Sequence, residues 1–235
     1  MWPQIPSTSQ PSSGLFTSLY SRLAHHKEDI LSIHISSGLS GTINSARLGA
    51  AELVEVAVEH VDSMTLSGGE RFQVLAAALA SRAGRNKEFI LERLRLIRQS
   101  TEVIYTLETL AYLAKGGRIG RVQALAGALL HLKPVINVDK VDGKYSTVGK
   151  ERTMPRALAN ITNHLHKIYG SKALWVTVLH GQIQEQAEQL ASMLQAVLNV
   201  GKIEILRISP VLGVHTGPGI VGVAVVPIEL MEDLT

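Results

Sequence analysis

The chain of 235 residues contains no cysteine, which excludes disulfide bonds, thiolate nucleophiles and cysteine-ligated zinc. Aromatic residues make up only 4% of it, and the formal net charge of +3 comes from scattered Lys and Arg residues. A nucleic-acid surface needs a concentrated basic patch, preferably with stacking aromatic side chains, so we expect no nucleic-acid partner. The absence of cysteine also fits a cytoplasmic protein.

Long uncharged apolar runs are missing as well. The run "GIVGVAVVPI" at 219–228 falls well short of the about 20 residues that a membrane-spanning helix needs. The first ten residues have neither the basic start nor the apolar centre of an export signal. We therefore expect no membrane span. A hydrophobic fraction of 46% with 18% charged residues indicates a globular protein with an ample core.

The first half of the chain alternates strand and helix patterns. Strands are predicted at 29–36, 58–63 and 101–107. Helices are predicted near 14–24 and at 42–54, 69–84 and 87–100, with a short helix that ends at Gly116 and Gly117. Such alternation is typical of a parallel sheet covered by helices, so we predict a Rossmann-like domain over residues 1–125.

The pattern changes after about residue 125. Residues 133–152 read as two strands joined by an Asp-Gly turn at 142–143, a strong hairpin signal. Further helices and strands follow, and "VLGVHTGPGIVGVAVVP" is expected to form a strand, a turn and a strand. We predict an α+β domain with a mainly antiparallel sheet over residues 126–235, and hence an α/β fold of two domains.

Two glycine-rich motifs invite nucleotide-binding interpretations that their surroundings do not support. "LSGGE" at 66–70 resembles the signature segment of ABC-type ATPases, but the G-x-x-x-x-G-K-[ST] loop of such proteins occurs nowhere in the chain. "GPGIVG" at 217–222 matches G-x-G-x-x-G, but a β-branched stretch follows where the dinucleotide fold requires a helix. We interpret the first as a helix start and the second as a turn before a strand.

A third cluster, "SSGLSGT" at 36–42, lies between a predicted strand and a predicted helix. Free backbone N–H groups and the helix dipole favour an anion at such a position. Ser40, Gly41 and Thr42 are therefore candidates for binding a phosphate or a carboxylate. Simple capping of the helix by Ser40 or Thr42 is an equally good interpretation.

Histidine is the other residue type in the chain that could bind a ligand or take part in catalysis. Of the nine histidines, His215 stands out because the glycines of "HTGPG" allow another group to approach the backbone closely. A buried, hydrogen-bonded core histidine explains His215 in isolation as well. The neighbouring histidines in "HH" and "HLH" fall on different helix faces, so we predict no metal site.

Eight segments recur in an order that resembles the DegV family of bacterial fatty-acid-binding proteins. They are "TSQPSSG" (8–14), "LSIHISSGLSGTINSA" (31–46), "VDSMTLSGG" (61–69), "LETLAYLAKGGRIG" (107–120), "LKPVINV" (132–138), "GKER" (149–152), "VLHG" (178–181) and "HTGPG" (215–219). The resemblance extends over essentially the whole chain.

The resemblance implies a two-domain α/β protein with a long-chain fatty acid buried between the domains. The carboxylate would be held by Thr8 of T-S-x-P-S, Ser40 of L-S-G-T and His215 of H-T-G-P-G. The groups expected close by are Ser9, Gly41 and Thr42. The family includes the lipid-carrying subunit of fatty acid kinase. The resemblance thus implies a non-catalytic protein without metal or cofactor, and a partner kinase that makes acyl-phosphate for phospholipid synthesis.

Arg118, Lys150 and Arg152 are candidates for docking that kinase or steadying the phosphoryl group, although solvated surface charge explains them nearly as well. Family members normally have a strand, a helix and a second strand before T-S-x-P-S, so we expect the N-terminal domain to be incomplete here. Two other functions stay open. One is a Ser/His hydrolase using Ser40 and His215, although "GLSGT" is not G-x-S-x-G. The other is a phosphate- or nucleotide-binding module using the same loop.

Overall fold

The computed structural model describes residues 6–25, 28–51, 53, 56–122 and 132–234. The strands are β1 (Ile30–His34), β2 (Val58–Asp62), β3 (Glu102–Leu107), β4 (Lys133–Val138), β5 (Tyr145–Glu151), β6 (Leu174–His180), β7 (Val200–Arg207) and β8 (Ile220–Pro227). The helices are α1 (Ser13–Ala24), α2 (Thr42–Ala50), α3 (Ser67–Arg82), α4 (Lys87–Ser100), α5 (Ala111–Lys115), α7 (Met154–Tyr169), α8 (Gln184–Val197) and α9 (Pro210–Thr216), with 3-10 turns η1 (Gly120–Val122) and η2 (Ile228–Leu230). Among the described residues, no helix has both the length and the apolar character needed to cross a membrane.

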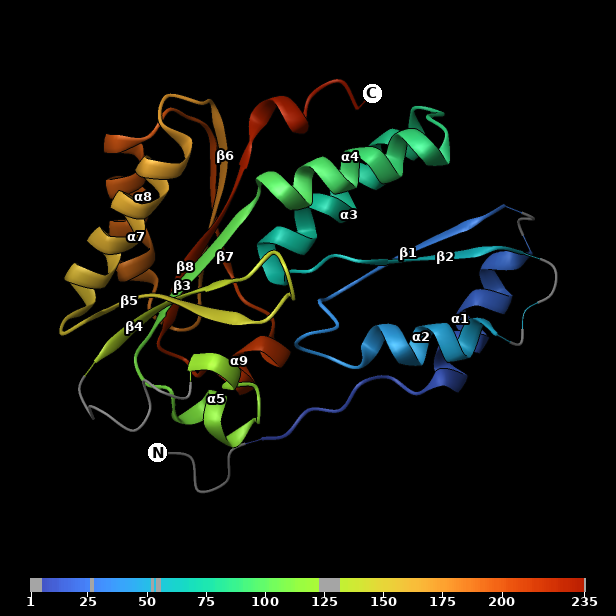
Figure 1. Ribbon diagram of the computed structural model, residues 1–235, viewed down its shortest axis with the longest axis horizontal. Coiled ribbons are helices and arrows are strands. Elements are labelled where there is room, and N and C mark those ends of the chain that lie inside the picture. The colour runs from blue at the N-terminus through green and yellow to red at the C-terminus, as the bar shows by residue number, and fades with distance from the viewer. Residues whose placement is uncertain (1–5, 26–27, 52, 54–55, 123–131, 235) are drawn as a thin grey trace.

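β1 and β2 form a small parallel sheet, in which Ile30 pairs with Val58 and His34 with Asp62. Figure 1 shows α1 and α2 on one side of this sheet and α3 and α4 on the other. Apolar residues at helical spacing explain how α2 sits there, because Ile43 is fully buried while the polar side of the helix faces solvent. The parallel, helix-covered arrangement predicted for these two strands is confirmed.

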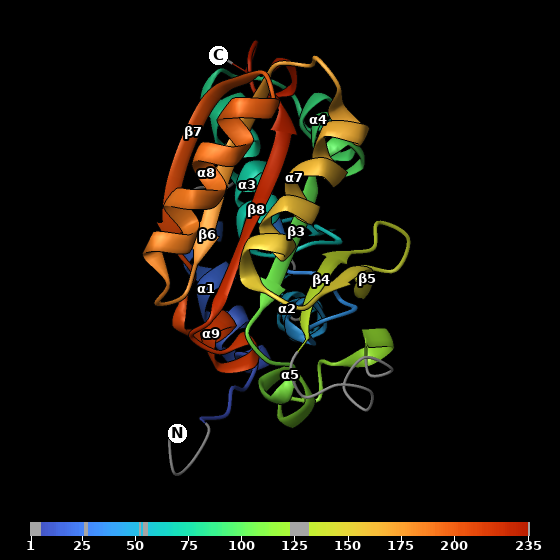
Figure 2. The same ribbon diagram turned by 90° about the vertical axis from the view of Figure 1, so that its left-hand side faces the viewer.

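The other six strands form one sheet in the order β5-β4-β3-β8-β6-β7. Only β6 and β7 are parallel among these neighbours. Successive residues of a strand point to opposite faces, so Val103 and Tyr105 pack with α3 and α4 while Ile104 packs with α7 and α8. Figure 2 shows α7 and α8 covering the near face. Burial on both faces explains why β8 is an almost uninterrupted apolar run.

Strand β3 belongs to a different sheet from the one that its position in the chain predicts. The alternation of the first half placed residues 101–107 in a parallel sheet with β1 and β2, but β3 is antiparallel to both β4 and β8 in the six-stranded sheet. Every residue of β3 is buried, as suits a central strand. Local alternation carries no information about which strand is the partner, so it could not reveal this pairing. The domain boundary predicted at 125–126 lies outside the described residues.

The end of the chain holds one confirmed turn and one correction. β4 and β5 form the predicted hairpin, with Gly143 at φ +65° in its turn. The segment "VLGV" at 211–214 is predicted as a strand and "HTGPG" at 215–219 as a turn, but residues 210–216 form helix α9. The reason is local: the Ser209 hydroxyl accepts a hydrogen bond from Leu212 N, and Pro210 occupies the first helical position, where it costs nothing.

The two glycine-rich motifs have structural explanations. "LSGGE" is a helix start, although α3 begins at Ser67, two residues before the predicted start. A Cβ on Gly68 would collide with Ala224 of β8. A Cβ on Gly69 would likewise collide with Val103 of β3. These glycines let α3 approach the large sheet closely. "GPGIVG" leads into strand β8 and not into a helix, which confirms that it is no dinucleotide fingerprint.

Candidate functional site

Thr8 and His215 meet although 207 residues separate them in the chain, and Thr8 Oγ1 lies 2.7 Å from His215 Nε2. Thr8 belongs to the extended segment before α1, which runs from beside α5 towards α1 (Figure 1). His215 lies in the last turn of α9, not in a turn between strands as predicted. The structure therefore brings together two of the three residues expected to hold a carboxylate.

The surroundings of His215 favour the neutral form of its imidazole. Burial lowers the pKa of His215, and the Arg118 guanidinium lowers it further. A Cβ on Gly116 would collide with His215 Nδ1, so glycine at the end of α5 allows this close approach. Nδ1 is buried and has no hydrogen-bond partner among the described residues. A neutral imidazole and a threonine hydroxyl carry one N–H and one O–H between them, and the contact between Oγ1 and Nε2 uses one of these two protons. When Nε2–H donates to Thr8 Oγ1, the Thr8 hydroxyl is free to donate to an oxyanion.

Ser40 lies on the loop between β1 and α2. Its hydroxyl is 2.8 Å from Thr42 Oγ1 and also accepts a weak hydrogen bond from Thr42 N at 3.3 Å. The residue before the helix is Gly41, which provides no side-chain cap. The simple capping interpretation thus explains only part of this cluster, and backbone N–H groups at the start of α2 are left for another acceptor.

Two residues connect the Ser40 loop to the Thr8 and His215 pair. Gln10 packs directly over Gly41, where a Cβ would collide with its amide, and donates a hydrogen bond to Ser45 Oγ at 3.2 Å. Arg118 donates to Gly116 O at 2.7 Å and to Leu39 O at 3.4 Å. The loop and the pair are neighbours, but no hydrogen bond between described residues joins Ser40 to Thr8 or His215.

The hairpin turn fixes the same loop from the other side. Ser36 donates a hydrogen bond from Oγ to Gly143 O at 2.8 Å, and a Cβ on Gly38 would collide with Asp142 O. The position of the Ser40 loop thus depends on contacts with both halves of the chain. Sequence reasoning missed Gln10 and Gly116 here. The first lies inside the T-S-x-P-S motif, and the second was interpreted only as a helix end.

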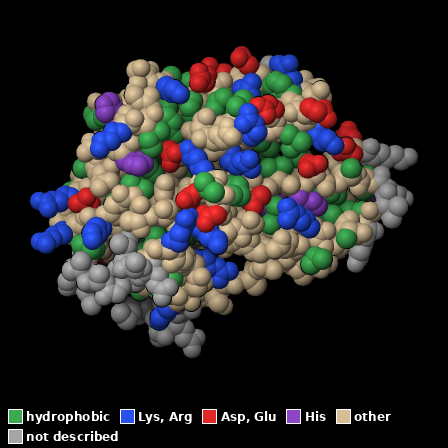
Figure 3. Space-filling view, in the orientation of Figure 1, with side chains coloured by type: hydrophobic (Ala, Val, Ile, Leu, Met, Phe, Trp, Pro, Cys, Tyr) green, Lys and Arg blue, Asp and Glu red, His purple; other side chains and the backbone are tan. Residues whose placement is uncertain are grey.

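The remaining candidates are less closely placed. Ser9 is exposed, and so are Lys150 and Arg152 around the end of β5. Among the described residues no hydrogen bond or ion pair links these three to Thr8, Ser40 or His215. On the face shown in Figure 3, acidic side chains lie among the Lys and Arg side chains across the centre and upper edge. A mixed surface of this kind does not favour a nucleic acid.

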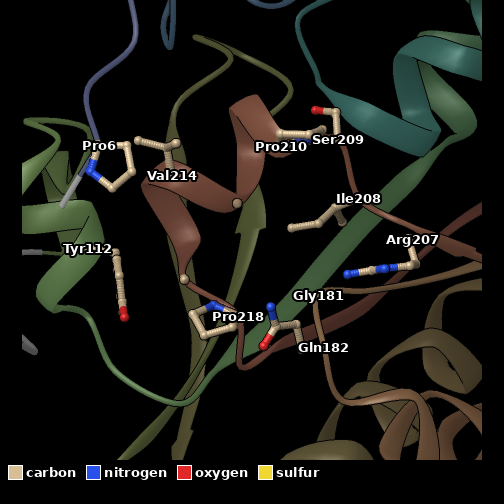
Figure 4. A pocket seen from close by; sticks show the side chains of 12 residues that line it. Pro6, Tyr112, Gly181, Gln182, Arg207, Ile208, Ser209, Pro210, Val214 and Pro218 are labelled. Carbon is tan, nitrogen blue, oxygen red and sulfur yellow. The ribbon is translucent and has the colours of Figure 1, made fainter. Parts of the chain in front are cut away.

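A pocket of about 570 Å³ lies beside α9, between Tyr112 of α5 and the ends of β6 and β7 (Figure 4). None of Thr8, Ser40 and His215 lines it. The lipid tunnel expected to lead away from these residues therefore stays a prediction. In the part of the chain that the structure describes, no group of three or more histidine or acidic residues could hold a metal ion.

Comparison with known proteins decides the family. The family model described as the DegV family matches residues 3–228. The chain belongs to the DegV family. A DegV domain-containing protein of Deinococcus radiodurans is 39% identical over 226 residues, which are 96% of this chain and 78% of that protein.

Solved structures of DegV proteins share the fold. A structure described as showing fatty acid binding of a DegV family protein from Thermus thermophilus matches with a TM-score of 0.88 and 32% identity, over 94% of this chain and 79% of that one. DegV of Bacillus subtilis, described as a fatty acid binding protein, matches with a TM-score of 0.84 and 28% identity, over 94% and 79%. The DegV resemblance and the mixed α/β fold expected from the sequence are both confirmed.

Proposed function

We propose that this chain binds a long-chain fatty acid and presents it to a partner kinase, which converts it to acyl-phosphate. The carboxylate is held by Thr8, Ser40 and His215, with Ser9 and the Gly41 and Thr42 amides close by. The observation that carries the proposal is the contact between Thr8 and the neutral imidazole of His215. The fatty acid binding described for the relatives from Thermus thermophilus and Bacillus subtilis supports it.

The chemistry of the site suits a carboxylate better than a phosphate dianion. Removing a carboxylate from water costs several kcal/mol, and hydrogen bonds to a charged acceptor return about 1.5–3 kcal/mol each. Thr8, Ser40 and His215 offer three such donors once the carboxylate replaces the contact between Thr8 and His215, and they place no full positive charge on the anion. Arg118 is the cation that lowers the pKa of His215, and its guanidinium suits the extra charge of a phosphoryl group.

Affinity comes from the acyl chain, because burial returns about 0.8 kcal/mol for each methylene. A pocket of about 560 Å³ beside β1 offers apolar walls for such a chain. Leu19 of α1, Leu31 and Ile33 of β1 and Ala77 of α3 are among the residues that line it. It lies along the strand that leads to the Ser40 loop.

The test is to replace Thr8, Ser40 and His215 singly by Ala and to measure the lipid retained by the purified protein with native mass spectrometry. We expect each change to reduce the retained fatty acid at least about tenfold, the equivalent of one charged hydrogen bond. Ser37→Ala, on the same loop but exposed, and His166→Ala, on the surface of α7, are the matched controls. Full retention in all three variants would overturn the assignment.

The kinase step is tested separately. The Arg152→Ala and Lys150→Ala variants should still bind the fatty acid. They should no longer support acyl-phosphate formation by the fatty acid kinase, the cytoplasmic partner that brings ATP. Arg118→Ala should weaken both, because Arg118 also holds the Ser40 loop through Leu39 O. Unchanged acyl-phosphate formation in the Arg152 and Lys150 variants would remove their docking role.

The two other functions make different predictions. In a hydrolase, Ser40 would bond to His215, but the Ser40 hydroxyl lies against Thr42. A fluorophosphonate probe that labelled Ser40 would favour the hydrolase over the carrier. A phosphate- or nucleotide-binding module would be stabilised against heat by phosphates and not by oleate or palmitate.

A further inference from the structure

The pocket beside α9 is separate from the groups assigned to the fatty acid carboxylate. α9 contributes Pro210, Gly213 and Val214, at spacings of three and four residues that mark one face of a helix, and Gly217 directly follows the helix. His215 lies on a different face, where it contacts Thr8 and the end of α5. Figure 4 shows the pocket between this face of α9 and the chain that follows β6.

One side of the pocket is polar. Arg207 ends β7, and Gln182 follows β6, so both lie at the carboxyl ends of two parallel strands, where open α/β sheets commonly bind ligands. In Figure 4 the Arg207 guanidinium points towards Gly181 and Gln182, across from the Tyr112 ring. Within the described part of the chain, the side chains of Arg207 and Gln182 make no hydrogen bond or ion pair.

The rest of the lining is mainly apolar. It includes the Tyr112 ring, Ile208 and Val214, together with Pro6 and Pro218. A volume of about 570 Å³ lies within the range of small-molecule sites. The combination of an unpaired guanidinium and amide with an apolar wall suits a ligand that is itself divided into an anionic head and an apolar body.

We propose that this pocket is a second binding site, for a small organic anion. The oxyanion head, a carboxylate or a phosphate monoester, binds the guanidinium of Arg207 and the amide of Gln182, because the planar guanidinium matches two oxygens of either group. The apolar body lies against Tyr112, Ile208 and Val214. The site does not depend on the fatty acid, although it shares α9 with His215.

Gly213 provides a way to fill the pocket without disturbing the fold. It lies in α9 with no strained φ, and a Cβ there would meet only Ile208 Cδ1, at 3.8 Å, an ordinary contact distance. Gly213→Ala should therefore leave the pocket open, whereas Gly213→Leu should place its branched side chain in the volume that the ligand needs.

The experiment measures binding of hexanoate and hexyl phosphate to the whole chain by isothermal titration calorimetry. Inorganic phosphate and hexanol, which carry only the head or only the body, are titrated alongside. We expect at least one six-carbon anion to bind more tightly than both half-ligands. Arg207→Gln should weaken it about tenfold or more, and Gly213→Leu should abolish it while Gly213→Ala retains it.

His215→Ala separates this site from the fatty acid site. Binding that survives His215→Ala and fails in Arg207→Gln supports the second site. Binding that is lost in His215→Ala but unchanged in Arg207→Gln and Gly213→Leu places the probe with the fatty acid and overturns the proposal. Equal affinity for inorganic phosphate and hexyl phosphate also overturns it. Circular dichroism checks that Gly213→Leu folds, and Arg207→Gln provides an independent answer if it does not.

Discussion

The large sheet and the small sheet are each stabilised by a different kind of contact. Every residue of β3, β6 and β8 is buried in the large sheet, between two layers of helices. In the small sheet only His34 is buried, and most residues of β1 and β2 are half-buried. The large sheet depends on apolar packing on both faces, whereas the small sheet depends more on polar and aromatic contacts.

Those polar contacts form one cluster under α1. Tyr20 OH lies 2.7 Å from Ser32 Oγ, which is 2.8 Å from His34 Nε2. The rings of His34 and His60 stack with centroids 6.1 Å apart. Because Ser40 follows β1 while His215 precedes β8, the candidate site needs both sheets in place. The less apolar sheet should therefore be where binding is most easily disturbed.

The largest difference between the sheets should come from truncating apolar side chains. Leu158→Ala, in the fully buried core of α7, should lower the free energy of unfolding by about 2–5 kcal/mol. Leu31→Ala, in half-buried β1, should lower it by about 1 kcal/mol. Chemical denaturation measures both. Equal losses would contradict the comparison.

A next, smaller effect should follow from adding a methyl group at a glycine. Gly68→Ala forces α3 away from Ala224 of the large sheet and should cost about 1–3 kcal/mol. Gly14→Ala is the matched control in α1, because its Cβ would meet nothing closer than Ser12 Oγ at 4.0 Å. It should be neutral or slightly stabilising. Thermal unfolding of the two variants checks the contrast.

Acid should weaken the small sheet selectively. Burial lowers the pKa of both His34 and His60, and His60 and Arg47 further lower that of His34, while Asp62 opposes the shift. Arg47 likewise lowers the pKa of His60, and Glu59 opposes it. Both rings are thus harder to protonate in the folded chain than in the unfolded chain, so the unfolded chain binds more protons as pH falls below about 6.5.

Stability should therefore be full above that pH and decline below it. Each unit by which folding lowers a pKa corresponds to about 1.4 kcal/mol. Hydrogen exchange between pH 7.5 and 5 should show β1 and β2 amides losing protection before those of β3 and β8. His34→Gln and His60→Gln should reduce this pH dependence, and exposed His166→Gln should not. Parallel loss in both sheets would be the contrary result.

The smallest expected effect is a change in the pKa of His215, which lies at the candidate site. The Arg118 guanidinium holds the pKa of His215 down, so Arg118→Ala should raise that pKa towards its ordinary value, by less than burial alone lowers it. A nuclear magnetic resonance titration of the His215 ring measures the shift. An unchanged or lowered pKa would show that Arg118 is not close enough to act on the site.

The sequence predicted most elements within a few residues, because their signals are local. Apolar spacing locates α3 and α7, and the Asp-Gly pair locates the turn between β4 and β5. The prediction from sequence was wrong where two local signals compete. The apolar residues of "VLGV" at 211–214 suggest a strand, but Ser209 and Pro210 start a helix there.

By itself, the sequence determined the family, the two kinds of sheet, and the residue types able to hold a carboxylate. Motifs are local patterns of residues, and they were sufficient to identify Thr8, Ser40 and His215 as candidates. Only the tertiary structure decided that β3 belongs to the large sheet and that Thr8 touches His215 across 207 residues. Strand partners and distant contacts are chosen by packing over the whole chain, and no local pattern encodes them.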